Sequence, residues 1–283
     1  MTLKPHPLIT PAELRSLTAS ERPVRILDVR WRLGEDDGRD QFDAGHIPAA
    51  VYVDMETELA RHGEPSDGRH PLPSKDVLQQ AIRRWGINQG DTVVVYDDWK
   101  SMSAARAWWL LRFAGFIDVR VLDGGWRGWL AAAGETETIE QQPAEGTAIA
   151  DWSQLPVLDS DSAAAIAKTG VLFDARAGER YRGEVEPIDP RAGHIPGARS
   201  LPTAGLTTND GRLLGAAELS ERLIAAGATS ADEVIGMYCG SGISAAHLAL
   251  AATVAGYDVA LYPGSWSQWS NLDRPVATGE ARG

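Results

Sequence analysis

The chain has 283 residues, roughly twice the usual length of one domain, so its length favours two domains. Hydrophobic residues make up 43% and charged residues 23%, which is ordinary globular usage and excludes a disordered chain. The net charge of −12 repels phosphate backbones and anionic lipid headgroups, so we expect neither nucleic acid nor a membrane among the partners. No apolar signal segment follows Met1, which predicts a cytoplasmic location.

Helix caps and short apolar runs alternate along the first half of the chain. Thr10-Pro11-Ala12-Glu13 is a capping box with proline at the first helical position, and Gly86 and Gly115 are typical helix ends. The elements predicted there are, in chain order, a helix that begins after Thr10, a strand at 25–29, a helix from 74 to 85, a strand at 92–96, a helix that ends at 114 and a strand at 119–122.

The second half shows the same alternation, after a polar stretch at 134–150 that we interpret as a link. Its predicted elements are a helix at 161–168, a strand at 171–174, a helix at 216–226, a strand at 233–238, a helix at 244–255 and a strand at 259–262. Short apolar strands separated by helices favour parallel pairing. We therefore predict an α/β fold in which each half is a mostly parallel sheet with helices on both faces.

The two halves also repeat one another in sequence. Ala44-Gly45-His46-Ile47-Pro48 recurs letter for letter as Ala192-Gly193-His194-Ile195-Pro196. Leu27-Asp28-Val29-Arg30 has a counterpart in Phe173-Asp174-Ala175-Arg176. Because the matches keep the same order along the chain, they indicate two copies of one domain.

The lone cysteine, Cys239, stands between a predicted strand and an alanine-rich helix. A single cysteine can form neither an intramolecular disulfide nor a cysteine metal cluster. Gly240 and Gly242 allow the backbone to curl so that N–H groups point inward, and the following helix adds its positive end. The thiolate is the form that gains from such donors, so the segment indicates a reactive thiol. A structural cysteine that closes a tight turn is the alternative.

The segment Cys239-Gly240-Ser241-Gly242-Ile243-Ser244-Ala245 resembles the active-site loop of the rhodanese (sulfurtransferase) family, in the form found in 3-mercaptopyruvate sulfurtransferases. Gly-His-Ile-Pro in both halves and Gly-Ser-Trp near the C-terminus extend the resemblance to nearly the whole chain. It implies two tandem rhodanese-like domains and a Cys239 thiolate that takes sulfane sulfur from a small anionic donor and holds it as a persulfide. Cyanide or a thiol then accepts the sulfur, with a thioredoxin-like protein among the candidate acceptors. The resemblance implies no metal and no organic cofactor.

The predicted first domain, at 1–140, has Asp97 where the second domain, at 150–283, has Cys239. A carboxylate cannot accept sulfur, and Asp98-Trp99-Lys100 replaces the glycine loop. We therefore expect the first domain to be catalytically inactive.

Candidate donor-binding arginines follow from the resemblance. Arg180 matches the arginine of the family's Arg-Phe/Tyr-x-Gly segment, and a guanidinium suits a carboxylate or sulfonate because it offers a planar fork of donors. A solvated surface arginine is the alternative. The mercaptopyruvate branch has a second arginine slightly further on, but this chain has Ile188 there. Arg182 or Arg191 is expected to substitute.

A proton relay is a further implication of the resemblance. His70 and Asp54 match positions that, with the loop serine, here Ser241, have been proposed to form a Ser–His–Asp relay in mercaptopyruvate enzymes. A histidine can move the proton of a donor thiol near neutral pH. Ordinary turn and cap hydrogen bonding is the alternative for both residues.

Three other functions compete with mercaptopyruvate sulfur transfer. Thiosulfate enzymes of the family place basic residues directly after the cysteine, whereas Gly240 and Ser241 are uncharged, so thiosulfate is the second choice of donor. Rhodanese-fold phosphatases have an arginine at the sixth position after the cysteine, and Ala245 stands there. A persulfide-carrying binding module with little turnover is the non-enzymatic alternative.

Overall fold

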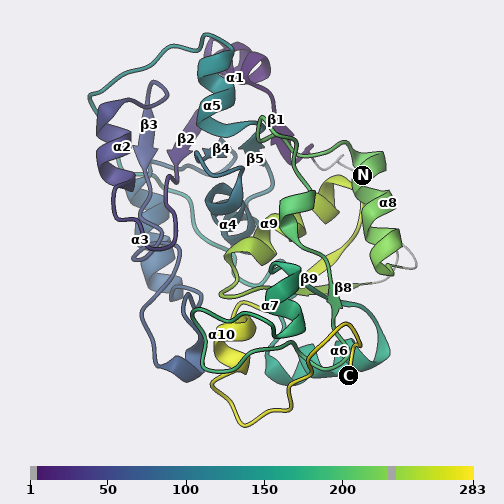
Figure 1. The fold of residues 1–283 in the computed structure, drawn as a ribbon. Helices are drawn as coiled ribbons and strands as arrows, with labels where there is room; N and C mark the ends of the chain where they lie inside the picture. The colour runs from purple at the N-terminus through teal and green to yellow at the C-terminus, as the bar shows by residue number, and fades with distance from the viewer. Residues whose placement is uncertain (1–4, 229–233) are drawn as a thin grey trace. The chain divides into compact units, whose positions relative to one another are not determined.

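The chain forms two compact units in the computed structural model, which describes residues 5–228 and 234–283 (Figure 1). Unit 1 consists of Met1–Ala60, Pro73–Gln154 and Thr207–Leu213, and unit 2 consists of Arg61–Leu72, Leu155–Leu206 and Leu214–Gly283. Each unit therefore takes one short segment from the other half of the sequence.

Unit 1 contains a parallel sheet of five strands among its described residues, in the order β1-β5-β4-β2-β3. Its strands are β1 (Leu8–Ile9), β2 (Val24–Asp28), β3 (Ala50–Tyr52), β4 (Thr92–Tyr96) and β5 (Val119–Leu122). Every residue of the central strand β4 is buried, as its unbroken apolar run predicts. The predictions at 25–29, 92–96 and 119–122 are confirmed, whereas β1 and β3 are too short to leave a sequence pattern.

Helices cover this sheet on both faces. They are α1 (Pro11–Thr18), α2 (Gly38–Ala44), α3 (Lys75–Arg84), α4 (Met102–Phe113) and α5 (Gly125–Ala131). Val94 and Tyr96 of β4 share a core cluster with Leu14, Phe42 and Trp129 from α1, α2 and α5. Successive residues of a strand point to opposite faces, and α4 packs against β4 and β5 on the other side (Figure 1).

The predicted helix caps form in unit 1. Thr10 Oγ1 accepts the Glu13 N–H at 3.2 Å, and Glu13 Oε2 accepts the Thr10 N–H at 2.8 Å. Ser74 Oγ likewise accepts the Val77 N–H at the start of α3, at 3.3 Å. These local bonds satisfy backbone donors that a helix start leaves unpaired, which is why the sequence alone located both helices.

Unit 2 repeats the plan with a parallel sheet of four strands among its described residues, in the order β7-β6-β8-β9. The strands are β6 (Leu172–Asp174), β7 (Arg199–Ser200), β8 (Ile235–Tyr238) and β9 (Val259–Leu261). Its helices and 3-10 turns are α6 (Ser160–Thr169), α7 (Gly178–Arg182), α8 (Ala216–Ala226), α9 (Ile243–Val254), α10 (Ser265–Trp269), η1 (Pro65–Asp67) and η2 (Thr203–Gly205). Position 233, where the strand predicted at 233–238 begins, lies outside the described residues.

Helices cover both faces of the second sheet as well. Leu172 and Tyr238 belong to a core cluster with Ala163 of α6, Tyr181 of α7 and Trp266 of α10. The helix α9 packs against β8 and β9, and α8 packs on α9. The predicted fold class, α/β with mostly parallel sheets and helices on both faces, is confirmed.

The two units also share a buried ion pair, formed by the last residue of β2 in unit 1 and of β6 in unit 2 with the arginine two positions later. Arg30 Nη2 lies 2.7 Å from Asp28 Oδ2, and Arg176 Nη2 lies 2.6 Å from Asp174 Oδ2. Burial disfavours the charged guanidinium of Arg176, but Asp174 holds the pKa of Arg176 above its ordinary value. Both pairs stand at the carboxyl edge of their sheet, the edge at which α/β folds bind ligands.

The polar link at 134–150 contains no helix or strand beyond a single bridge between Glu137 and His46. It is nevertheless held in place, because the Gly146 N–H donates to the Arg83 carbonyl at 2.8 Å and the Ala148 N–H to the Ile87 carbonyl at 3.1 Å. Among the described residues, no helix has both the length and the apolar character that crossing a bilayer requires.

Candidate active site

The strand β8 ends at Tyr238 and delivers Cys239 to the carboxyl edge of the second sheet. Cys239 is only 2% exposed. Its N–H donates to Ser265 Oγ at 3.1 Å, and its carbonyl accepts the Trp266 N–H at 2.8 Å. The Gly242 N–H donates to Cys239 Sγ at 3.1 Å. The backbone therefore curls around the sulfur and offers it an N–H dipole, as a thiolate or persulfide anion requires.

The loop itself is short, because Ile243 and Ser244 already belong to the first turn of α9. Gly242 caps this helix with a φ of 86°, a left-handed conformation that side chains disfavour, so glycine is needed there. The Gly240 carbonyl accepts the Ser267 N–H of α10 at 2.8 Å. Two helix starts thus fix the loop, and the positive end of α9 adds to the field at the sulfur.

Two guanidinium groups lie against Gly240. A methyl group added to its Cα would lie 3.6 Å from Arg180 Nη1 and 3.4 Å from Arg69 Nη2. Arg180 comes from α7, whereas Arg69 comes from the segment Arg61–Leu72 and is held by its N–H, which donates to Ser267 Oγ at 3.0 Å. Sequence reasoning placed Arg180 in the site but missed Arg69.

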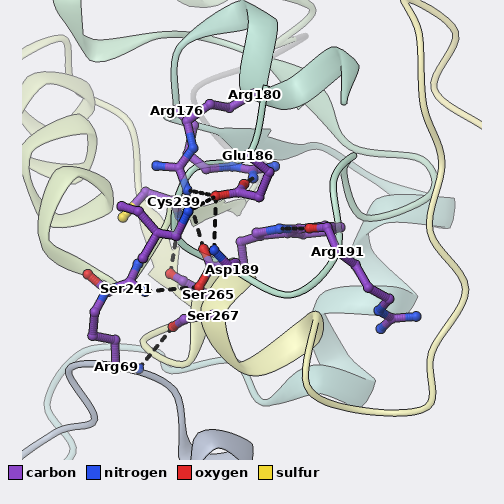
Figure 2. Close-up of polar contacts among 12 residues, drawn as sticks. Arg69, Arg176, Arg180, Glu186, Asp189, Arg191, Cys239, Ser241, Ser265 and Ser267 are labelled. Carbon is purple, nitrogen blue, oxygen red and sulfur yellow. Dashed lines mark hydrogen bonds and ion pairs between the residues drawn. The ribbon is translucent and has the colours of Figure 1, made fainter. Parts of the chain in front are cut away.

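Two buried carboxylates hold these arginines in position (Figure 2). Asp189 lies 2.9 Å from Arg69 Nη1 and 3.3 Å from Arg180 Nη2. Glu186 lies 2.6 Å from Arg180 Nη2 and 3.1 Å from Arg176 Nη1. Both carboxylate side chains are 3% exposed, so their charges need these cations as partners and fix the guanidinium planes in return.

The other two predicted donor-binding arginines lie elsewhere. Arg191 donates to main-chain carbonyls between Trp269 and Arg274, and Figure 2 shows its guanidinium turned away from Cys239. Arg182 pairs with Glu184 at 2.7 Å on the surface of unit 2. Neither guanidinium lies at the loop, since each is bonded to partners elsewhere in unit 2.

His70 reaches the loop from the same segment as Arg69. Its Nδ1 lies 2.7 Å from Ser241 Oγ, and both side chains are buried. Asp54, the third member of the predicted relay, lies in unit 1, where its Oδ1 accepts the N–H groups of Glu56 at 2.9 Å and Thr57 at 3.0 Å. A part for Asp54 in a relay stays a prediction.

Several residues of the site escaped sequence reasoning. They are Arg69, Arg176, Glu186, Asp189, Ser265 and Ser267. One signal was present, because Arg69 directly precedes His70, which the resemblance singled out. The two acidic residues follow Arg180 within nine positions, but exposed acidic residues are common enough to hide such partners.

The first copy keeps the loop geometry although Asp98-Trp99-Lys100 replaces the glycines. The buried Asp97 carboxylate accepts four backbone N–H groups at 2.8 to 2.9 Å, those of Trp99, Ser101, Ser103 and Ala104. Lys100 and Ser101 adopt the left-handed φ values, 55° and 66°, that glycines were expected to supply. Glycines are therefore not needed to form the nest in this copy: a side-chain anion fills it and stabilises the strained turn.

Comparisons with known proteins agree with this geometry. Residues 10–132 and 159–272 each match the family described as Rhodanese-like domain. The chain is 47% identical over 280 residues to the "Putative thiosulfate sulfurtransferase SseB" of Mycobacterium tuberculosis, which covers 97% of this chain and 98% of that relative. It is 35% identical over 262 residues to the 3-mercaptopyruvate sulfurtransferase of Escherichia coli, which covers 89% of this chain and 92% of the relative.

A solved structure gives the same result. The crystal structure of SseA from Escherichia coli, described as a 3-mercaptopyruvate sulfotransferase, superposes with a TM-score of 0.81 at 32% sequence identity. The match covers 93% of this chain and 99% of that one. Relatives named for thiosulfate and for 3-mercaptopyruvate thus both match the chain over most of its length. The chain belongs to the rhodanese family and is a sulfurtransferase built from two rhodanese-like domains.

Proposed function

We propose that the chain transfers sulfane sulfur from 3-mercaptopyruvate to a thiophilic acceptor through a persulfide on Cys239. The observation that carries this choice of donor is the contact between His70 Nδ1 and Ser241 Oγ, 2.7 Å, in the loop that begins at Cys239. Thiosulfate leaves as sulfite and needs no proton. Mercaptopyruvate leaves as a carbon base and needs one, so a buried proton path suits it.

The chemistry is balanced without any cofactor. The Cys239 thiolate attacks the donor sulfur, an S–S bond forms, and the C–S bond breaks with its electron pair on the methylene carbon. Ser241 and His70 move the thiol proton to that carbon, which gives pyruvate and leaves the persulfide anion. Cyanide then attacks the outer sulfur to give thiocyanate and the Cys239 thiolate; a thiol, including that of a thioredoxin-like protein, can take the sulfur in the same way.

The electrostatics of the site support this cycle. The thiolate and the persulfide are both anions, and the Gly242 N–H and the start of α9 offer them fixed dipoles. Arg180 is positioned at Gly240 to bind the carboxylate of the donor. All of these groups lie in the second copy. The corresponding loop of the first copy has no part in the sulfur transfer, because its Asp97 carboxylate cannot accept sulfur. A reducing compartment such as the cytoplasm keeps a lone thiol available for this chemistry.

Thiosulfate is the second candidate donor. It is favoured by the two guanidiniums at Gly240, which suit a dianion, and by the name of the Mycobacterium tuberculosis relative. Against it stand the uncharged Gly240 and Ser241 and the proton path that sulfite does not need.

The two donors are separated by measuring kcat/KM for 3-mercaptopyruvate and for thiosulfate with cyanide as acceptor. We expect a preference for 3-mercaptopyruvate of about tenfold or more, since proton transfer by a positioned side chain contributes that much. A preference for thiosulfate contradicts the proposed donor.

The persulfide is tested separately by intact mass after donor treatment without acceptor. We expect the mass of one sulfur atom added at Cys239, and neither the adduct nor turnover in Cys239→Ser. An adduct with negligible turnover indicates a persulfide carrier, and turnover in Cys239→Ser contradicts the mechanism.

A further inference from the structure

We propose that Arg69 is the second donor-binding arginine of this enzyme and that it determines affinity for the anionic donor together with Arg180. The inference deepens the proposed function and rests on it for the identity of the donor. Arg69 would supply the cation that the resemblance implies at position 188, where this chain has Ile188 instead of an arginine.

The free donors of the two guanidiniums converge on one place. Asp189 engages Nη1 of Arg69, and Asp189 and Glu186 engage Nη2 of Arg180. The remaining terminal nitrogens, Arg69 Nη2 and Arg180 Nη1, have no hydrogen-bond partner among the described residues and are the two nearest to Gly240. In each guanidinium the carboxylates thus bind one terminal nitrogen and leave the other terminal nitrogen available to a ligand.

The arrangement is built for a ligand rather than for stability alone. The side chains of Arg69 and Arg180 are 24% and 19% exposed, so an anion from solvent can reach them. Their Nε atoms are buried and have no hydrogen-bond partner among the described residues, so both guanidiniums keep donor groups that the protein leaves unsatisfied. Gly240 has no side chain, so nothing from this position stands between the loop and the two guanidiniums.

The position of Ile188 explains why Arg69 can substitute. Ile188, Arg69 and Asp189 line the same cavity of about 520 Å³, together with His62, Ser267 and Asn271. A guanidinium from either position 69 or position 188 can therefore enter the same space. In this chain the cation comes from the segment Arg61–Leu72 instead of from the loop after α7.

The test compares Arg69→Gln with Arg61→Gln, a control in the same segment whose side chain is 45% exposed and pairs with Asp67. We expect Arg69→Gln to raise KM for the donor by about 10- to 100-fold with kcat changed by less than about threefold, the effect of losing a charge-assisted bond. Arg69→Lys should raise KM by less than Arg69→Gln does, because lysine keeps the positive charge although it lacks the planar set of donors. Arg61→Gln should leave both constants unchanged.

A measurement of binding without turnover tests the role of Arg69 whichever donor the enzyme prefers. Pyruvate and thiosulfate are titrated by calorimetry into Cys239→Ser with and without Arg69→Gln. We expect Kd to rise by about tenfold or more for the probe that corresponds to the preferred donor. If thiosulfate proves to be that donor, the proposed function fails while the Arg69 effect remains. Unchanged Kd for both probes, or a fall in kcat alone, overturns the role of Arg69.

A rescue variant distinguishes binding from a structural role. Adding Ile188→Arg to Arg69→Gln should return KM to within about threefold of the original value, because the new guanidinium enters the same cavity. Failure to recover KM overturns the claim that Arg69 replaces a cation at position 188.

Discussion

At the scale of single residues, the sulfur of Cys239 contacts a backbone N–H, whereas the charged side chains lie beside the neighbouring residue of the loop. The Gly242 N–H contacts Sγ at 3.1 Å, while Arg69 and Arg180 lie against Gly240. This division suits a cycle in which the sulfur stays anionic throughout but the donor comes and goes. A cation bonded directly to the persulfide would stabilise it and slow its transfer to the acceptor.

Ser241 provides a residue-scale test of the proton path. We expect Ser241→Ala to lower kcat with 3-mercaptopyruvate by about 10- to 100-fold, because the link from His70 to the donor is lost, and to lower kcat with thiosulfate by less than about threefold. Steady-state rates with the two donors give the comparison. Ser220→Ala on α8, whose hydroxyl has only a 3.4 Å contact with Tyr257, is the control. An equal loss with both donors would show that Ser241 shapes the loop rather than moving a proton.

At the scale of elements, the same strand–loop–helix unit is built twice around two different anions. After β8 the loop surrounds the Cys239 sulfur, and after β4 it surrounds the Asp97 carboxylate. The main-chain bond that fixes each loop also recurs, because the N–H groups of Trp126 and Trp266 donate to the carbonyls of Asp97 and Cys239, both at 2.8 Å. The nest is thus a property of the fold, and the residue at its centre decides whether it holds a thiol or a carboxylate.

Replacing the internal anion should therefore destabilise unit 1. We expect Asp97→Ala to lower the free energy of unfolding by about 3 kcal/mol, because four buried N–H groups lose their acceptor. Urea unfolding measures this loss, with the exposed Asp36→Asn as control. Sulfur transfer per folded molecule should stay within about twofold, since Cys239 lies in unit 2. A change in unfolding free energy of less than about 1 kcal/mol would contradict the stabilising role.

At the scale of the whole molecule, each unit contains a short segment from the other half of the sequence. Arg61–Leu72 brings Arg69 and His70 into unit 2, and Thr207–Leu213 joins unit 1, where the Leu213 N–H donates to Asp123 Oδ1 at 3.0 Å. The second half of the sequence alone therefore lacks two groups of the proposed site. The first half of the sequence therefore contributes directly to the unit that contains Cys239.

Buried tyrosines predict how the whole molecule responds to alkaline pH. Burial raises the pKa of Tyr52 and of Tyr181 to about 12, and it also raises those of Tyr96, Tyr238 and Tyr262. Below the ordinary tyrosine pKa of about 10, both the folded and the unfolded chain keep the phenol proton. Above it the unfolded chain loses protons that the folded chain retains, so stability falls as pH rises.

The expected loss is about 1 kcal/mol at about pH 11 for each of Tyr52 and Tyr181. Urea unfolding at about pH 9 and about pH 11 measures it, and ultraviolet absorbance of tyrosinate follows the ionisation. Equal stability at the two pH values would show that these phenols ionise as freely in the folded chain as in the unfolded one.

What the sequence determined by itself is local. The capping box at Thr10, the buried strand at 92–96 and the glycines around Cys239 act over a few residues, so their elements could be predicted with the α/β class and the reactive loop. Contacts between distant positions needed the tertiary structure. The resemblance pointed to His70 and Ser241, which are 171 positions apart, but only the structure shows that their side chains meet. It likewise shows that Arg69, whose one signal in the sequence is that it precedes His70, lies against Gly240. The nest around Asp97 was likewise hidden, because a carboxylate supported by the whole sheet edge can hold Lys100 and Ser101 in a backbone conformation that propensity alone disfavours.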